Sequence, residues 1–219
     1  MINNKKITVE KAHNLALKNH QENKLEEAQD LYNQVLKIDP NHSNALNNLG
    51  VLFKQLKKSY EAVSCFEKLI KIDPTNLNVL NTLGNIYKEL KEIQKAKACY
   101  EKAIKIDPKY VIAHNNLGVL LNQLGEIQKA KACYEKVIEI DPKYVKAHSN
   151  LGLVLRDLGE YQKAKTCFEK AIKIDPKYVI AHNQLGVILT KLIEYKKAKV
   201  CYEKAIEIDP DYIEAHNNL

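Results

Sequence analysis

Apolar residues recur at helical spacing in two successive stretches of the chain, and a proline follows the second stretch. Over residues 77–90 the apolar side chains fall three and four residues apart, which predicts one buried face of an α-helix. A short polar turn at Lys91 and Glu92 follows, and residues 93–104 carry a second stripe of the same spacing. Asp107–Pro108 ends this stripe, because a residue that precedes proline disfavours the helical conformation. The pattern predicts two amphipathic helices of about 12–14 residues each, joined by a tight turn.

The whole pattern repeats every 34 residues along the chain. All six prolines lie at this spacing, and each follows an aspartate: Pro40, Pro74, Pro108, Pro142, Pro176 and Pro210. A fixed period of this size is typical of stacked repeats, because a pair of short helices cannot bury its apolar face alone. We therefore expect an all-α fold, an α-solenoid of antiparallel helix pairs.

Two small residues recur at constant positions within the period. The first helix carries a glycine in five of the six repeats: Gly50, Gly84, Gly118, Gly152 and Gly186. The second helix carries an alanine in all six: Ala28, Ala62, Ala96, Ala130, Ala164 and Ala198. Glycine within a helix costs about 1 kcal/mol relative to alanine. A cost repeated at one position predicts that the two helices of each pair touch there.

These positions resemble the tetratricopeptide repeat family. In residues 77–110, Leu80 stands where the family has tryptophan, and the remaining signature positions are Leu83–Gly84, Tyr87, Ala96, Tyr100, Ala103 and Pro108. The resemblance covers residues 9–219. It implies a right-handed superhelix whose first helices line a concave, protein-binding face.

The period divides the chain into a tail, six repeats and a partial seventh. The expected boundaries are 1–8 for the tail, then 9–42, 43–76, 77–110, 111–144, 145–178 and 179–212, with 213–219 opening a seventh repeat. The first repeat has Ala16 and Asn19 in place of the glycine and the aromatic residue, and an acidic second helix, which predicts a solvent-facing cap. Since no such cap follows residues 195–208, we expect more chain or a partner to cover that end.

Charge and cysteine usage narrow the class of protein. The 219 residues carry a formal net charge of +7, spread along the chain as a Lys/Glu surface. The sequence has neither the apolar run of a membrane span nor that of a secretory signal, so a cytoplasmic, reducing location is expected. The five cysteines recur every 34 residues, too far apart for disulfides or a zinc site, and are interpreted as packing residues: Cys65, Cys99, Cys133, Cys167 and Cys201.

Four histidines stand where the family usually has tryptophan: His114, His148, His182 and His216. Residues one repeat apart are too distant to bind one metal ion, so each ring is expected to pack at a repeat joint with one nitrogen bonded locally. No phosphate-binding loop or catalytic motif interrupts the repeat. We expect no enzymatic activity, no metal and no cofactor.

The polar edge of the first helices is rich in asparagine, although asparagine is an indifferent helix former. The residues are Asn47, Asn48, Asn81, Asn85, Asn115, Asn116, Asn150 and Asn183, and Asn14, Gln184, Asn217 and Asn218 continue the rows. Amides offer a donor and an acceptor, so such rows suit the backbone of an extended peptide. The arrangement resembles the asparagine ladder of O-GlcNAc transferases. The alternative is that asparagine fills solvent-facing positions in an Asn-rich chain.

A second family site, the carboxylate clamp, is matched only in part. Asn85, Asn116 and Lys146 match it, whereas Asn81 and Asn150 replace two of its three cations. Tight capture of a terminal carboxylate is therefore disfavoured. Small apolar residues lie between the polar ones and are expected to form pockets for partner side chains: Val51, Ile112, Val119, Leu153, Ile180 and Val187.

The expected function is a scaffold or adaptor within a multi-protein complex, binding a peptide or helix of a partner on the concave face. Two alternatives stay open. One is the repeat arm of a longer enzyme similar to O-GlcNAc transferase, which a longer reading frame would reveal. The other is an RNA-binding helical repeat, which is disfavoured because related RNA-reading repeats run at 35 residues without this signature. No membrane association is expected.

Overall fold

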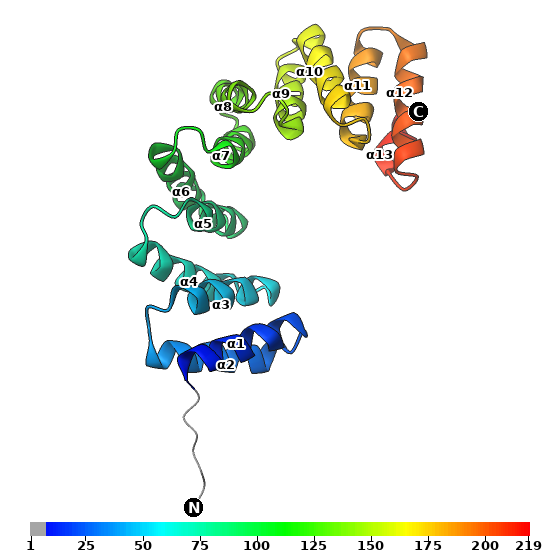
Figure 1. Cartoon of the computed structure of the whole chain (residues 1–219). Coiled ribbons are helices and arrows are strands. Elements are labelled where there is room, and N and C mark those ends of the chain that lie inside the picture. The colour runs from blue at the N-terminus through cyan, green and yellow to red at the C-terminus, as the bar shows by residue number, and fades with distance from the viewer. Residues whose placement is uncertain (1–7) are drawn as a thin grey trace, which may run out of the picture. The chain divides into compact units, whose positions relative to one another are not determined.

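The computed structural model describes residues 8–219, and the secondary structure in that range is entirely helical (Figure 1). The tail expected at residues 1–8 lies outside the described residues, apart from Thr8. The first helices of the pairs are α1 (Val9–Gln21), α3 (Ser43–Gln55), α5 (Leu77–Glu89), α7 (Val111–Gln123), α9 (Val145–Asp157) and α11 (Val179–Lys191). The second helices are α2 (Leu25–Ile38), α4 (Ser59–Ile72), α6 (Ile93–Ile106), α8 (Ile127–Ile140), α10 (Tyr161–Ile174) and α12 (Tyr195–Ile208), and α13 (Ile213–Asn218) follows. The two helices predicted from residues 77–104 are confirmed as α5 and α6.

The helices form two compact blocks. The N-terminal block contains α1–α6 and ends at Pro108, and the C-terminal block, Lys109–Leu219, contains α7–α13. Within each block the two helices of a pair pack against each other, and each second helix packs against the first helix of the next pair. The first helices α7, α9 and α11 are direct neighbours in the C-terminal block. This stacking is the α-solenoid architecture that the period predicts.

Each pair turns through one residue in the left-handed conformation. This residue is Asn23, Lys57, Lys91, Gly125, Gly159 or Ile193, with φ between 58° and 75°. In the third repeat, the turn is closed by backbone hydrogen bonds from Lys91 N to Lys88 O (3.0 Å) and from Glu92 N to Tyr87 O (2.8 Å). This is the usual C-terminal stop of a helix, in which glycine is favoured. Ile193 is the least favourable of the six, since branching at Cβ makes positive φ costly.

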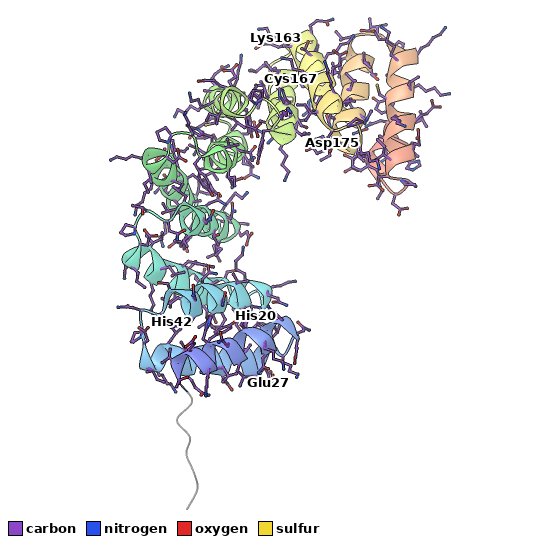
Figure 2. All side chains as sticks on the ribbon, viewed as in Figure 1. His20, Glu27, His42, Lys163, Cys167 and Asp175 are labelled. Carbon is purple, nitrogen blue, oxygen red and sulfur yellow. The ribbon has the colours of Figure 1, made fainter. Side chains whose placement is uncertain are left out.

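The aspartate before each proline organises the turn between repeats. Asp73 Oδ1 accepts a hydrogen bond from Thr75 N at 3.0 Å, and Asp175 Oδ1 accepts one from Lys177 N at 3.0 Å. Figure 2 shows Asp175 just beyond the end of α10, with Lys163 and Cys167 on the helix itself. An aspartate that binds the backbone two residues on mimics a backbone turn. The recurring Asp-Pro pair therefore both ends one helix and shapes the entry into the next.

The helix pairs make the close contact that the recurring glycine predicts. A Cβ atom on Gly118 would lie 2.7 Å from Tyr134 Cε1, and one on Gly152 would lie 2.8 Å from Phe168 Cζ. These rings belong to the second helix of the same pair, and Tyr134 and Phe168 are buried. The recurring alanines, such as Ala130, are fully buried as well. The glycine is thus required by an aromatic ring that crosses the first helix.

The prediction that one nitrogen of each histidine ring is bonded locally is confirmed for His148, His182 and His216. Nε2 lies 2.9 Å from Pro142 O in His148, 3.0 Å from Pro176 O in His182 and 2.8 Å from Pro210 O in His216. Because a carbonyl only accepts, Nε2 of each ring carries the proton. The cysteines are free, and burial raises the pKa of Cys65, Cys99 and Cys167 to about 11. These thiols are therefore un-ionised at neutral pH, in keeping with a packing role.

We predict that Gly118→Val lowers the free energy of unfolding by more than about 2 kcal/mol, because the new side chain overlaps the Tyr134 ring. Urea unfolding followed by circular dichroism measures the loss. The control is Gly118→Ala made in the parent and in a Tyr134→Leu background, where the ring is gone. The alanine should cost clearly less in the second background, and equal losses would contradict the contact.

We predict that Ile193→Gly raises the free energy of unfolding by about 0.5–1 kcal/mol. The left-handed conformation costs a non-glycine residue roughly 1–2 kcal/mol, and the added freedom of glycine in the unfolded chain offsets part of the gain. Val200→Gly is the matched control, since Val200 is also exposed and β-branched but lies within α12. It should lose about 0.5 kcal/mol. A loss at both positions in thermal melts would rule out strain at Ile193.

Candidate functional site

The first helices of the C-terminal block present one polar and aliphatic stripe each. On α9 the stripe is Lys146, Asn150 and Leu153, which share a side of the helix because they lie four and three residues apart. Lys146 is exposed, and Asn150 and Leu153 are half-buried. The equivalent residues are Ile112, Asn116 and Val119 on α7 and Ile180, Gln184 and Val187 on α11. We call these nine residues the C-terminal first-helix face.

This surface is continuous because α7 packs beside α9 and α9 beside α11. Ile112 and Ile180 are 41% and 39% exposed, so they are large aliphatic side chains open to solvent. Val119, Leu153 and Val187 are half-buried between the amides. The predicted mixture of amides and small apolar side chains is therefore brought together within this block.

The N-terminal block presents a more polar version of the stripe. Asn48 and Val51 lie on α3, and Asn85 lies on α5. Asn48 and Asn85 are half-buried, and Val51 is 44% exposed. Asn85 Oδ1 accepts a hydrogen bond from the Tyr100 hydroxyl at 2.7 Å. Its carbonyl oxygen is therefore already engaged by the second helix of its own pair.

A second row of amides lies one residue before the stripe, and part of it is buried. Asn47 is exposed and Asn81 is half-buried, but Asn115 is only 6% exposed and Asn183 only 1%. The expectation that Asn115 and Asn183 lie on a solvent-facing edge is therefore wrong. The physical reason is the neighbouring repeat, whose side chains cover and bind these amides.

The amides bind one another across repeats. Asn150 Nδ2 donates to Asn115 Oδ1 at 3.2 Å, and Asn218 Nδ2 donates to Asn183 Oδ1 at 3.0 Å. Each pair is separated by 35 residues, one repeat plus one residue. A buried amide would otherwise lose its bonds to water, so the pairing stabilises the joint. Within residues 8–219 nothing donates to Asn150 Oδ1, which stays available to an external N–H group.

Arg156, the one arginine of the chain, replaces this pairing at the joint between α9 and α11. Ser149 stands there in place of an asparagine, and Arg156 Nη1 donates to Gln184 Oε1 at 2.8 Å. The same guanidinium binds Asp157 Oδ1 through Nε (2.9 Å) and Nη2 (2.8 Å). Sequence reasoning missed this residue, although a single arginine among 34 basic residues was a usable signal.

A row of tyrosines precedes the first helices of the C-terminal block. Tyr144, Tyr178 and Tyr212 are half-buried, and burial raises the pKa of each hydroxyl. Ser149 offsets part of the pKa rise of Tyr178, and Asn183 offsets part of that of Tyr212, so each of these inner-row side chains lies close to a tyrosine hydroxyl. These rings cover the inner amide row and stay neutral hydrogen-bonding groups at physiological pH. The tyrosine two residues after each of the last four prolines was the signal that sequence reasoning left unused.

His42 takes this place before α3, and Asn76 takes it before α5. His42 Nδ1 caps α3 by accepting from Ala45 N at 3.1 Å, and its ring lies 5.0 Å from that of His13. Burial, followed by the neighbouring His42, lowers the pKa of His13. Asn48 Nδ2 lies 3.3 Å from His13 Nε2, so an amide–histidine pair joins the first two repeats. Figure 2 shows His42, just before α3, and His20, near the end of α1, at opposite ends of the first two helix pairs.

The described residues meet neither the requirements of a metal site nor those of a membrane-spanning helix. Across residues 8–219 no three His, Cys, Asp or Glu side chains are arranged to hold a metal ion. No helix in the same range combines the length and apolar character needed to cross a bilayer. The arrangement of the first-helix face can donate and accept hydrogen bonds and bury small apolar side chains.

Family models of the tetratricopeptide repeat match most of the chain. One model matches residues 43–76, 111–144, 145–178 and 179–212, which is four repeats. A second, described as TPR repeat, matches 18–57 and 84–125, and a third matches 65–98. Comparison with curated protein sequences finds no match.

Solved structures share the fold. A crystal structure of MamA has 25% sequence identity and a TM-score of 0.67, covering 76% of this chain and 97% of its own. PilF of Pseudomonas aeruginosa has 19% identity and a TM-score of 0.76, covering 95% of both chains. YrrB, described as a TPR protein with an unusual peptide-binding site, has 21% identity and a TM-score of 0.65, covering 85% of this chain and 96% of its own.

We predict that Asn115 and Asn150 are energetically coupled across their joint. Asn150→Ala leaves a buried acceptor on Asn115 without its donor, so it should lower the free energy of unfolding by about 1–2 kcal/mol. A double-mutant cycle with Asn115→Ala should give a coupling of about 0.5–1.5 kcal/mol in urea unfolding. Asn47→Ala is the control, because Asn47 is exposed, and should cost less than about 0.5 kcal/mol. Additive losses would show that the bond contributes nothing.

Proposed function

Because the chain belongs to the tetratricopeptide repeat family, we propose that it is a non-catalytic scaffold that binds an extended segment or a helix of a partner protein on its first-helix face. The observation that carries this proposal is the C-terminal first-helix face. Three neighbouring helices there place half-buried amides between aliphatic side chains. Such a surface supplies hydrogen bonds for a peptide backbone and contacts for its side chains.

The amide geometry supports binding of a backbone rather than of one particular side chain. Asn150 uses Nδ2 to hold the joint and leaves Oδ1 to accept from a peptide N–H. The aliphatic contacts on either side of it, Val119, Leu153 and Val187, recur once per repeat. A partner segment lying across the helices would therefore meet equivalent contacts at each repeat. A protein of this fold, YrrB, is described as having a peptide-binding site, which is consistent with such a use.

The residues of the predicted site divide into two roles under this proposal. Asn116, Lys146, Asn150 and the three aliphatic residues form the binding surface of the C-terminal block, and Asn47, Asn48, Asn81 and Asn85 serve the N-terminal block. Asn115 and Asn183 are buried and do not contact the partner under this proposal. They accept hydrogen bonds from Asn150 and Asn218 and so hold those side chains in place. Membership of a multi-protein complex is part of the proposal.

Photo-crosslinking tests the face directly. A benzoylphenylalanine at Leu153 on α9 should capture a protein partner in extract of the source cells, and mass spectrometry should map the crosslink to one contiguous segment. The matched control is the same residue at Thr166, which is exposed on α10 in the same repeat. Equal capture at both positions, or capture at Thr166 alone, would contradict binding on the first-helix face.

A further inference from the structure

We propose that the segment bound by the C-terminal first-helix face is acidic, an extended stretch of a partner protein in which carboxylates and apolar residues alternate at a spacing of about three residues. This inference rests on the proposed function and specifies the chemistry of the partner. It is carried by the distribution of charge between the two kinds of helix.

The first helices of the C-terminal block carry almost no negative charge. On α7, α9 and α11 the cations are Lys146, Arg156 and Lys191, and the one acidic residue is Asp157. Asp157 is neutralised by Arg156, whose Nη2 lies 2.8 Å from its Oδ1. This side of the block therefore presents positive charge without a compensating carboxylate of its own.

The second helices of the same block have the opposite character, because their charges are mixed and largely paired. Lys136 pairs with Glu139 at 2.9 Å, and Lys204 pairs with Glu207 at 2.7 Å. Lys165 reaches across a joint to Glu194 at 2.9 Å. Ion pairing within the fold thus accounts for many lysines on the second helices, but not for those on the first-helix side.

Three lysines on α9 or in the turns that lead into α9 and α11 are exposed and form no ion pair with any residue in 8–219: Lys143, Lys146 and Lys177. Lys143 and Lys177 directly precede Tyr144 and Tyr178, so they are equivalent positions one repeat apart. Lys146 lies in the first turn of α9, where the helix dipole disfavours a cation. Local electrostatics therefore do not stabilise this lysine, whereas a bound carboxylate would.

The lysines share their surface with the hydrogen-bonding and aliphatic groups. Lys146 lies on the same stripe as Asn150 and Leu153. Packed helix axes lie about 8–10 Å apart, and an extended chain rises about 3.3 Å per residue. A segment lying across α7, α9 and α11 therefore advances one repeat in about three residues. Carboxylates at that spacing match Lys143 and Lys177, which are one repeat apart, while intervening apolar side chains meet Val119, Leu153 and Val187.

The aliphatic content of the face favours a peptide over a nucleic acid. Ile112 and Ile180 occupy, on α7 and α11, the place that Lys146 takes on α9. A strand of RNA would instead need cations along its whole backbone and open aromatic faces for its bases. The nearby tyrosines Tyr144, Tyr178 and Tyr212 are half-buried, so they offer no fully open aromatic face.

The N-terminal block lacks these cations at the equivalent positions. Asn41 and Thr75 stand where Lys143 and Lys177 stand, and Asn44 and Asn78 stand where Lys146 does. Selection for acidic segments is therefore a property of the C-terminal block alone.

Fluorescence anisotropy of the full chain with labelled twelve-residue peptides tests the proposal. The probes are (Glu-Leu-Gly)4, (Gln-Leu-Gly)4 and (Lys-Leu-Gly)4 at about 50 mM salt, where screening is weak. We expect the acidic peptide to bind at least about tenfold more tightly than the glutamine peptide, and the lysine peptide not to bind. The affinity of (Glu-Leu-Gly)4 should fall as the salt concentration is raised.

Charge reversal locates the effect. The triple variant Lys143→Glu, Lys146→Glu and Lys177→Glu should weaken binding of (Glu-Leu-Gly)4 at least about tenfold. The matched control is Lys170→Glu, Lys173→Glu and Lys196→Glu, which makes the same charge change at exposed residues of α10 and α12 that also lack ion pairs within residues 8–219. The control should bind within about threefold of the parent. Circular dichroism confirms that both variants are folded.

Each other outcome overturns the proposal in a distinguishable way. Equal losses in the two triple variants would show that net charge, and not this face, attracts the peptide. Equal binding of the acidic and glutamine peptides, both abolished by Leu153→Arg, would remove the acidic selectivity and leave the proposed function intact. Failure of all three peptides, together with no capture at Leu153, would remove both. Tighter binding of polyuridine, lost with the same three lysines, would replace the peptide by a nucleic acid.

Discussion

The contact between a helical glycine and an aromatic ring sets the geometry on which the rest of the structure depends. In five repeats the first helix has no side chain where the ring of Phe66, Tyr100, Tyr134, Phe168 or Tyr202 crosses it. The approach fixes the distance and rotation of the two helices in a pair, and the rotation decides which residues of the first helix face outward. The cost of glycine to the helix, about 1 kcal/mol per site, is offset by the burial of a large ring. In the first repeat Ala16 takes the place of the glycine, and it is fully buried.

Once the pairs are fixed, polar groups hold successive pairs in register. His148, His182 and His216 each bind the carbonyl of the proline six residues earlier, and at two joints an asparagine of one repeat donates to an asparagine of the repeat before it. Lys131 and Lys165 add ion pairs to Glu160 and Glu194 of the following repeats. These groups are directional, whereas apolar packing alone would tolerate sliding of one pair over another. The same amide row therefore serves two purposes, with its inner members joining repeats and its outer members facing solvent.

The division between joining and binding residues explains why charge is segregated. Most lysines on the second helices of the C-terminal block pair with carboxylates on the same helix, in the adjoining turn or across a joint. The first helices of this block combine amides and aliphatic side chains with Lys146, which forms no ion pair with any residue in 8–219. Under our proposal, this surface binds a ligand that supplies an extended backbone and negative charge.

The sequence by itself determined the repeat length, the all-helical fold, the helix boundaries near residues 77–106 and the close approach at the glycines. Each of these depends on local preferences repeated in phase: helical spacing of apolar residues, the Asp-Pro stop and a small residue at a constant position. The roles assigned to the histidines and cysteines also followed from the period, since it separates them too far to act together.

Only the tertiary structure decided which amides are exposed. Asn115 and Asn116 are adjacent in sequence and chemically identical, yet Asn115 is buried beneath the next repeat and Asn116 lies half-exposed on the stripe. Helical periodicity places them about 100° apart but does not say how far the neighbouring repeat reaches around the helix. Tyr178, Tyr212 and Arg156 contribute to that reach, and each lies against a residue about 30 positions away in the neighbouring repeat. A pattern read within one repeat carries no information on such contacts, because they form only when a second repeat packs against the first.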